Sequence, residues 1–171
     1  MDRLRAKIRD IPDFPKPGVV FKDITPLVKD PATLRLTVHK LLEPFWGRNI
    51  TAIAGMEARG FIFGSIAAWD MGVSFIPLRK PGKLPYDIQS VSYDLEYGSA
   101  TLEAHVDAFD GNDRVLLIDD LLATGGTAKA SCELVEALGA TVEALAFVIE
   151  LDFLEGCKKL EGYEVHSLVH Y

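Results

Sequence analysis

Residues 115–127 read Val-Leu-Leu-Ile-Asp-Asp-Leu-Leu-Ala-Thr-Gly-Gly-Thr, and the order of residue types here indicates the architecture. The four apolar residues at the start predict a buried strand, and two carboxylates follow it directly. A turn of small residues and glycines then leads into a predicted helix. In open α/β sheets, ligands bind beyond the carboxyl ends of the strands, near the N-terminus of a helix. The stretch therefore predicts an α/β fold and, at the same place, a ligand-binding turn.

Short apolar strands and helices alternate on both sides of this stretch. Such alternation is typical of an open, mostly parallel sheet flanked by helices on both faces. Because no linker divides the 171 residues, we expect a single α/β domain spanning residues 1–171. The predicted strands are Thr51–Ala54, Ser74–Leu78, Arg114–Ile118 and Thr141–Ile149, and the predicted helices are Gly60–Met71 and Thr127–Leu138.

The N-terminal part of the chain carries different signals. Residues 2–10 predict a short amphipathic helix, and the turn-rich stretch Ile11–Gly18 follows. Asp30 and Pro31 predict the start of another helix, because a carboxylate caps free N–H groups and proline fits the first turn. The apolar face of that helix is expected to consist of Leu34, Val38, Leu41, Leu42 and Phe45.

The segment between the second and third predicted strands has two parts. Lys80–Gln89 contains two prolines and a glycine and predicts a mobile loop. Val91–Tyr97 and Ala100–Ala104 then predict a hairpin that turns at Gly98-Ser99.

The composition argues against a nucleic-acid or membrane partner. The formal net charge is −7, and an acidic surface repels the phosphates of nucleic acids. The longest apolar run, near Phe61–Trp69, is far shorter than the roughly 20 residues that span a bilayer. The charged N-terminus lacks the apolar stretch of a signal peptide.

Cys132 and Cys157 are too few for a disulfide framework, so we expect reduced thiols in the cytoplasm. His166 and His170 are expected to share one face of a terminal strand and do not indicate a metal site.

The turn after the third predicted strand has the composition of a phosphate site. Successive N–H groups at a helix N-terminus bind an anion, and glycines permit the dihedral angles and close approach that this requires. Asp119 and Asp120 would repel a phosphate alone, but they accept hydrogen bonds from sugar hydroxyls and suit a nearby magnesium ion. A ribose 5-phosphate group has both features; the alternative is a capped turn whose acids face water. The predicted phosphate ligands are Ala123, Thr124, Gly125, Gly126 and Thr127.

Val115–Ala128 resembles the signature of the type I phosphoribosyltransferase family, which binds 5-phosphoribosyl 1-diphosphate at a strand, loop and helix of this kind. The resemblance implies that Asp119 and Asp120 hold the ribose hydroxyls while the turn holds the 5-phosphate. Other stretches resemble the members of this family that act on adenine, in the same order along nearly the whole chain. They are Phe14–Pro26, Gly55–Gly64, Arg79–Pro85 and Tyr93–Gly98.

The resemblance also implies a diphosphate site built from two segments. The glycines of Gly55–Gly60 resemble an NTPase P-loop, but Phe61-Ile62 stand where Lys and Ser or Thr would follow. For the basic side chains, the alternative is a solvated surface charge. The implied ligands are Glu57, Ala58 and Arg59 in the first segment, and Arg79 and Lys83 in the second.

For the base, the resemblance implies that backbone groups of Val20 and Lys22 recognise the edge of adenine, while Phe21 and Leu151 pack on its faces. The family can have arginine where this chain has Lys22, which leaves recognition by the main chain unaffected. For Phe21, the alternative is a core aromatic residue.

The implied reaction is displacement of diphosphate from C1 of the sugar by a purine nitrogen, giving AMP from adenine. Glu96 matches the general acid/base of the family, with an exposed strand carboxylate as the alternative, and Tyr97 matches a residue that contacts the reacting phosphates. Mg²⁺ is the expected cofactor, held by substrate and water with Asp119 and Asp120 nearby, without direct protein ligands. We also expect a homodimer, an N-terminal hood segment (residues 1–30) at the base, and a mobile, water-excluding active-site loop (residues 80–92).

Three alternatives compete with this interpretation. A regulator that senses 5-phosphoribosyl 1-diphosphate and contacts nucleic acid would need a basic face or an added module, and we expect neither. A transferase for hypoxanthine, guanine or xanthine keeps the fold, but Phe14–Pro26 and Tyr93–Gly98 argue against it. A receiver domain also closes a strand with an acidic pair, yet it leaves Ala123–Thr127 unexplained. We therefore expect an enzyme that transfers the phosphoribosyl group to adenine.

Overall fold

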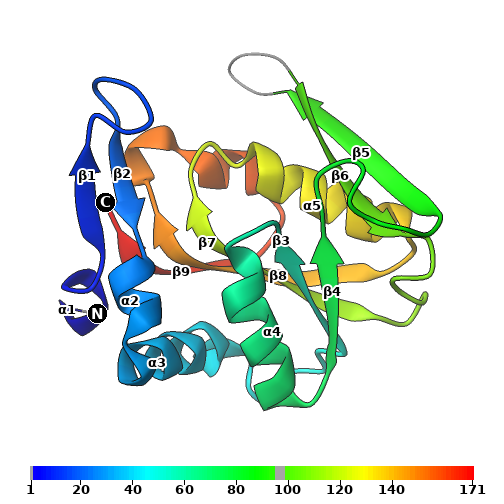
Figure 1. The fold of residues 1–171 in the computed structure, drawn as a ribbon. Helices are drawn as coiled ribbons and strands as arrows, with labels where there is room; N and C mark the ends of the chain where they lie inside the picture. Colours follow the sequence, from blue (N-terminus) through cyan, green and yellow to red (C-terminus); the bar gives the residue numbers. More distant parts are fainter. Residues whose placement is uncertain (1, 95–98) are drawn as a thin grey trace.

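The centre of the molecule is a five-stranded sheet in the order β4-β3-β7-β8-β9, and all neighbouring strands run parallel (Figure 1). The structure, a computed structural model, describes residues 2–94 and 99–171. The predicted open, mostly parallel sheet is therefore confirmed. Its strands are β3 (Ala52–Met56), β4 (Ser74–Leu78), β7 (Arg114–Leu122), β8 (Thr141–Glu150) and β9 (Val165–His170).

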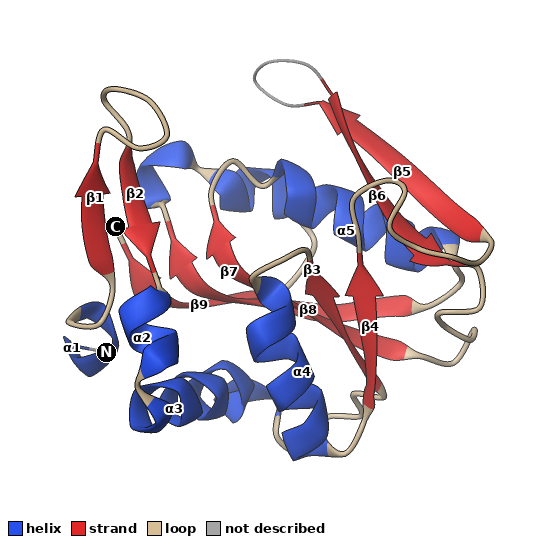
Figure 2. Ribbon diagram, viewed as in Figure 1, coloured by secondary structure: helices blue, strands red, loops and turns tan. Residues whose placement is uncertain are grey.

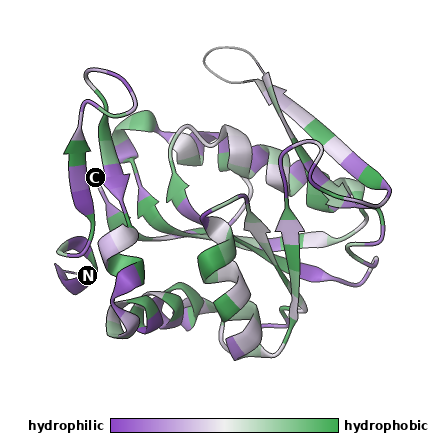
Figure 3. Ribbon diagram, in the orientation of Figure 1, coloured by the Kyte–Doolittle hydropathy of each residue, from purple (hydrophilic) through white to green (hydrophobic). Residues whose placement is uncertain are grey.

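Helices cover both faces of this sheet, as predicted (Figure 2). On one face lie α3 (Pro31–Leu42) and α4 (Gly60–Met71), and on the other lies α5 (Gly126–Ala137). Successive side chains of a strand point to opposite faces, so β7 contributes to two cores. Leu116 packs into the core that contains α3 and α4, whereas Leu117 packs into the core that contains α5. Hydrophobic residues accordingly run along α4 and the central strands (Figure 3).

Smaller elements surround the sheet. The antiparallel hairpin of β1 (Arg9–Pro12) and β2 (Val20–Asp23) stands at one end, close to the C-terminus (Figure 1). The hairpin of β5 (Ile88–Asp94) and β6 (Ser99–His105) packs on α5. The remaining elements are the helices α1 (Asp2–Arg5) and α2 (Thr25–Lys29) and the short 3₁₀ helices η1 (Glu43–Phe45), η2 (Asp152–Leu154) and η3 (Gly156–Leu160).

The predicted helix over residues 2–10 is wrong in its second half. The helix α1 ends at Arg5, and Arg9–Pro12 forms strand β1, which pairs with β2. Ion pairs tie the two strands together, with 2.6 Å between Arg9 Nη2 and Asp23 Oδ2 and 2.8 Å between Lys22 Nζ and Asp10 Oδ1. Pairing with a distant strand has overridden the local helical pattern.

Three other predicted boundaries also shift. The third strand was expected to end at Ile118 but continues to Leu122, because β8 is long enough to pair with it as far as Glu150. Both acids of the signature therefore lie within a strand. The predicted loop over residues 80–89 ends earlier, since Ile88 already pairs with His105 in the hairpin. Ser99, predicted as part of the hairpin turn, already belongs to β6 and pairs with Asp94, whereas Gly98 lies outside the described residues.

The helix start predicted at residues 30 and 31 is confirmed. The carboxylate oxygen Oδ1 of Asp30 accepts hydrogen bonds from the N–H groups of Ala32 (3.1 Å) and Thr33 (3.2 Å), and Pro31 is the first residue of α3. No helix in the described ranges has the length and apolar character needed to cross a membrane.

The strand order fixes where a ligand can bind. Strand β3 has β4 on one side and β7 on the other, so the direction in which successive strands are added reverses between β3 and β7. In such sheets ligands bind at this switch point, outside the carboxyl ends of the strands. The turn after β3 (residues 57–59) and the end of β7 meet there.

Candidate active site

The predicted phosphate ligands surround one small cavity between the end of β7 and the start of α5. The cavity has a volume of about 80 Å³. Gly125, directly before α5, has a φ of 76°, in the left-handed region that favours glycine. The first N–H groups of a helix have no partner within it and are available to an anion. The lining includes Asp119 and all five predicted phosphate ligands: Ala123, Thr124, Gly125, Gly126 and Thr127.

A backbone-to-backbone contact supports this turn from behind. A Cβ atom on Gly125 would overlap the carbonyl oxygen of Gly156, and a Cβ atom on Gly156 would overlap the carbonyl oxygen of Ala123. The turn therefore rests directly on the start of η3. The role of Gly156 is not visible in the sequence, because its neighbouring residues do not indicate contact with a turn so far away in the chain.

The two acids of β7 are held in different ways. The Asp120 side chain is 3% exposed, and its Oδ2 lies 2.8 Å from Arg59 Nε. The Asp120 N–H donates a hydrogen bond of 2.8 Å to Oδ1 of Asp119. Burial, with the neighbouring charge of Asp120, raises the pKa of Asp119 well above its usual range, and burial also raises the pKa of Asp120 against the opposing effect of Arg59. Asp120 is therefore held by Arg59, whereas Asp119 lines the small cavity.

Gly60 lets the turn after β3 approach the acid pair. It is the first residue of α4, and a Cβ atom there would lie 2.6 Å from the carbonyl oxygen of Ile118 and 3.0 Å from Oδ1 of Asp119. This spacing leaves no room for a side chain. The close approach brings Arg59, the preceding residue, within reach of Asp120.

The Arg59 side chain also contacts the N-terminal hairpin. Its Cζ lies 5.2 Å from the centre of the Phe21 ring, a distance at which a cation and an aromatic face attract each other. The same ring packs edge-on against Phe14, with 5.2 Å between the ring centres. Arg59 therefore links the predicted sugar site to the predicted base segment.

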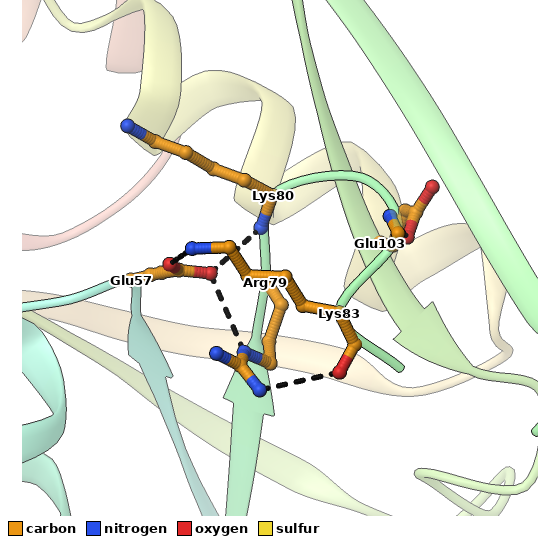
Figure 4. Close-up of polar contacts among 6 residues, drawn as sticks. Glu57, Arg79, Lys80, Lys83 and Glu103 are labelled. Carbon is orange, nitrogen blue, oxygen red and sulfur yellow. Dashed lines mark hydrogen bonds and ion pairs between the residues drawn. The ribbon is translucent and has the colours of Figure 1, made fainter. Parts of the chain in front are cut away.

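The remaining predicted diphosphate residues gather around Glu57. The peptide bond between Glu57 and Ala58 is cis. Arg79, directly after β4, and Lys83 both direct their side chains to the Glu57 carboxylate (Figure 4). Arg79 and Glu57 directly follow β4 and β3, and Asp119 lies near the carboxyl end of β7. Because these strands are neighbours, the three residues lie along one edge of the sheet.

A second, larger cavity of about 540 Å³ adjoins the first. Three predicted base residues, Val20, Lys22 and Leu151, line it, and Thr124 lines both cavities. Phe21 is not among the lining residues of this larger cavity, so its packing on the base stays a prediction. The other lining residues are Asp10, Gly18, Val19, Phe153, Leu154 and Tyr171.

The side chain of Lys22 has defined partners in this region. Its Nζ lies 2.8 Å from Asp10 Oδ1 and 3.7 Å from the centre of the Tyr171 ring. The side chain thus closes one wall of the cavity and joins the hairpin to the C-terminal residue, while the Lys22 main chain stays in the strand.

The two predicted catalytic residues, Glu96 and Tyr97, lie outside the described residues. Their sequence motif begins at Tyr93, whose hydroxyl oxygen is 3.1 Å from Oγ1 of Thr127. This contact with the phosphate turn is not predictable from the sequence, since the residues around a strand tyrosine do not indicate its partner. This hydrogen bond attaches the β5–β6 hairpin to that turn.

Comparison with known proteins identifies the family. No protein-family model matches the chain. The adenine phosphoribosyltransferase of Methylococcus capsulatus is 72% identical over 171 residues, which is 100% of both chains. The chain belongs to the adenine phosphoribosyltransferase family. The crystal structure of the Thermoanaerobacter pseudethanolicus enzyme, 49% identical, matches with a TM-score of 0.97 over 99% of each chain. The Saccharomyces cerevisiae enzyme, 38% identical, matches with a TM-score of 0.93 over 98% of this chain and 97% of its own, in complex with adenine and D-2,5-dideoxy-2,5-imino-altritol 1,6-bisphosphate.

Next to Leu151 and Tyr171, which line the larger cavity, three potential metal ligands meet. Glu150, Asp152 and His170 place one ligand atom each within 4.8 Å of one another. The sequence does not indicate that His170 meets these two acids, because they lie at and just beyond the end of a different strand. The hydrogen bond to Asp152 (2.9 Å) raises the pKa of His170, although its partial burial opposes this.

Replacing Gly60 with alanine is expected to weaken ribose 5-phosphate binding by about tenfold or more, since small displacements of a site have large effects. The added methyl group would push the turn after β3 away from Asp119 and the end of β7. Binding can be measured by titration calorimetry. Gly111→Ala is the matched control, because its Cβ would meet only Gly139 O at 3.9 Å and the φ of Gly111 is not positive. Equal affinity of both variants would contradict the assigned close approach.

The His170 contact predicts a pH-dependent contribution to stability. Because its pKa is raised by folding, the contribution is fully present below the unfolded pKa of about 6.5. It is lost as pH rises through the higher folded pKa. Urea unfolding of wild type and His170→Gln should therefore differ most in acid and converge as pH rises. In an Asp152→Asn background the difference should shrink, and a difference that grows with pH would refute the assignment.

Proposed function

We propose that this chain transfers the 5-phosphoribosyl group of 5-phosphoribosyl 1-diphosphate to adenine, forming AMP and diphosphate. The observation that carries the proposal is the pair of adjoining cavities. The small one is lined by Asp119 and residues 123–127, the larger one by Lys22 and Leu151, and Thr124 belongs to both. Phosphate, sugar and base follow one another in the same order in a nucleotide. The adenine and sugar bisphosphate bound to the yeast relative support this reading.

The phosphate turn and the acid pair fix the sugar. The N–H groups of residues 123–127 and the hydroxyls of Thr124 and Thr127 hold the 5-phosphate. Asp119 and Asp120 accept hydrogen bonds from the ribose hydroxyls and so orient C1 toward the larger cavity. Holding the sugar and the base in the orientation that the reaction requires removes much of the entropic barrier to a reaction between two molecules.

The basic residues stabilise the leaving group. As the bond from C1 to the diphosphate breaks, positive charge develops on the sugar and negative charge on the diphosphate oxygens. Arg59, 40% exposed and anchored on Asp120, stands where it can meet the diphosphate, and Arg79 and Lys83 approach from the neighbouring strand end. Cations fixed before the reaction stabilise this charge without reorganisation.

The donor set at the switch point also fits magnesium, a hard cation that prefers oxygen ligands. Asp119 and Asp120 supply carboxylate oxygens there, but Asp120 is already paired with Arg59. These acids would therefore hold the water molecules of a magnesium ion that the substrate binds. Such an ion would neutralise part of the charge on the leaving diphosphate.

The base is held by the N-terminal hood segment (residues 1–30). The backbone groups of Val20 and Lys22 recognise the edge of adenine, and Glu96 accepts or shifts the proton of the attacking purine. Tyr97 contacts the reacting phosphates. The active-site loop (residues 80–92) excludes water, and its movement is expected before Ile88, where β5 begins.

The assembly that we propose is a homodimer in the cytoplasm. Trp69 is 82% exposed on α4, beside a groove to which Pro31, Leu34, Val38 and Ile66 contribute. Association of two copies would cover an aromatic side chain of this size. Both cysteines, Cys132 and Cys157, are free thiols, as expected in a reducing compartment.

A direct test offers adenine, hypoxanthine, guanine and xanthine separately, each with 5-phosphoribosyl 1-diphosphate and magnesium chloride. We expect AMP from adenine, with kcat/KM at least about 10³-fold above that of any other base, because a site built around hydrogen bonds rejects analogues that leave its groups unpaired. Nucleotide formation is followed by chromatography. Turnover of another purine with none of adenine would refute the proposal.

Removing the charges of the acid pair tests the sugar assignment. In the double variant Asp119→Asn and Asp120→Asn, the affinity for ribose 5-phosphate should fall about tenfold or more, because hydrogen bonds to charged acceptors are replaced by weaker ones. Adenine affinity should change little. Asp110→Asn, an exposed acid outside both cavities, serves as the matched control. Unchanged binding in the double variant would contradict the assigned hydroxyl contacts.

A further inference from the structure

Glu57 is a nearly buried carboxylate surrounded by donors. Its side chain is 7% exposed and follows β3 directly. One carboxylate oxygen, Oε2, accepts from Arg79 Nε at 3.3 Å and from the Lys80 N–H at 2.9 Å, and the other, Oε1, accepts from Lys83 Nζ (Figure 4). Burial alone would raise the pKa of Glu57, but Lys83, the Lys80 N–H and Arg79 together lower it below its usual value. The group is therefore an anion at neutral pH.

The partners of Glu57 are the cations assigned to the diphosphate. Arg79 and Lys83 are 33% and 44% exposed, so both remain accessible from solvent. The Arg79 guanidinium also donates to the carbonyl oxygen of Lys83 at 3.2 Å, which holds the two residues together. An anion that arrives at these side chains meets a protein carboxylate already in place.

The segment that carries these cations has a second anchor. Arg79 and Glu103 exchange backbone hydrogen bonds of 2.8 and 2.7 Å, and the Glu103 side chain accepts from the Gly82 N–H at 3.1 Å. This anchor does not involve the side chains of Arg79 and Lys83. Residues 79–83 can thus keep their position while Lys83 and Arg79 exchange one anionic partner for another.

We propose that Glu57 is a positioning residue that holds Arg79 and Lys83 as their counter-ion until diphosphate takes its place. The carboxylate preserves the arrangement of the two cations and competes with the diphosphate for them, so it limits diphosphate affinity and favours product release. Arg59 and the buried Asp120 repeat the same pairing on the neighbouring strand end. The inference rests on the proposed function, since that function makes diphosphate the ligand of these cations.

The test measures binding of inorganic diphosphate, with magnesium chloride at fixed ionic strength, by titration calorimetry. Glu57→Gln keeps the shape and an acceptor but removes the competing charge, so diphosphate should bind about tenfold more tightly. A variant that was only destabilised would bind more weakly. Glu164→Gln is the matched control, because it breaks an ion pair with Arg48 that lies outside both cavities.

A double-variant cycle assigns the effect to the ion pair. Lys83→Met should weaken diphosphate binding, and adding Glu57→Gln to it should then change affinity by only about twofold, because the main partner is gone. An equal gain with and without Lys83 would overturn the inference, as would unchanged or weaker binding in Glu57→Gln alone.

A third experiment uses the wild-type protein, so its result does not depend on whether a variant folds. Carbon NMR of labelled glutamate side chains should show the pKa of Glu57 rising when diphosphate is added, because its cations leave. An unchanged pKa of Glu57 would refute the exchange.

If adenine gives no AMP while Glu57→Gln still tightens diphosphate binding, the proposed function fails and this inference stands. If AMP forms without that tightening, only the inference fails. If the wild type does not bind diphosphate at all, both the proposed function and the inference are overturned.

Discussion

The site depends on one steric constraint, the contact between Gly60 and the end of β7. Because Gly60 has no side chain, the turn after β3 can sit against the Ile118 carbonyl group and Asp119. The parallel sheet alone would bring two strand ends near each other, but it would not bring Arg59 to Asp120. The ion pair, the orientation of the acid pair and the contact with Phe21 all follow from that approach.

Paired charges are the second organising feature. Each cation assigned to the diphosphate already has a carboxylate partner with little exposed surface: Arg59 has Asp120, and Arg79 and Lys83 have Glu57. Unpaired cations at a partly buried site would repel one another and lose hydration without compensation. The acidic partners therefore let the chain bring three cations together at one site, within a molecule whose net charge is −7.

The sequence alone was sufficient to predict the sheet, the flanking helices and the residues of the phosphate turn, because each depends on local patterns of apolar residues and glycines. It failed where distant pairing decided the outcome. Residues 9 and 10 pair with β2 although they were predicted as the end of a helix, and β7 continues past Ile118 because β8 offers pairing partners. The partners of Glu57, Tyr93 and Gly156 could not be predicted either, since a single sequence does not show which distant residues come into contact.

The contact between Gly125 and Gly156 restricts how related sequences can diverge. Neither position tolerates a methyl group, because each would strike main-chain atoms that no change of rotamer can move. The two positions are therefore coupled sterically, although only Gly125 belongs to the signature of residues 115–128. A side chain at Gly156 in η3 would displace the phosphate turn, so the residues on which that turn depends extend beyond the contiguous signature.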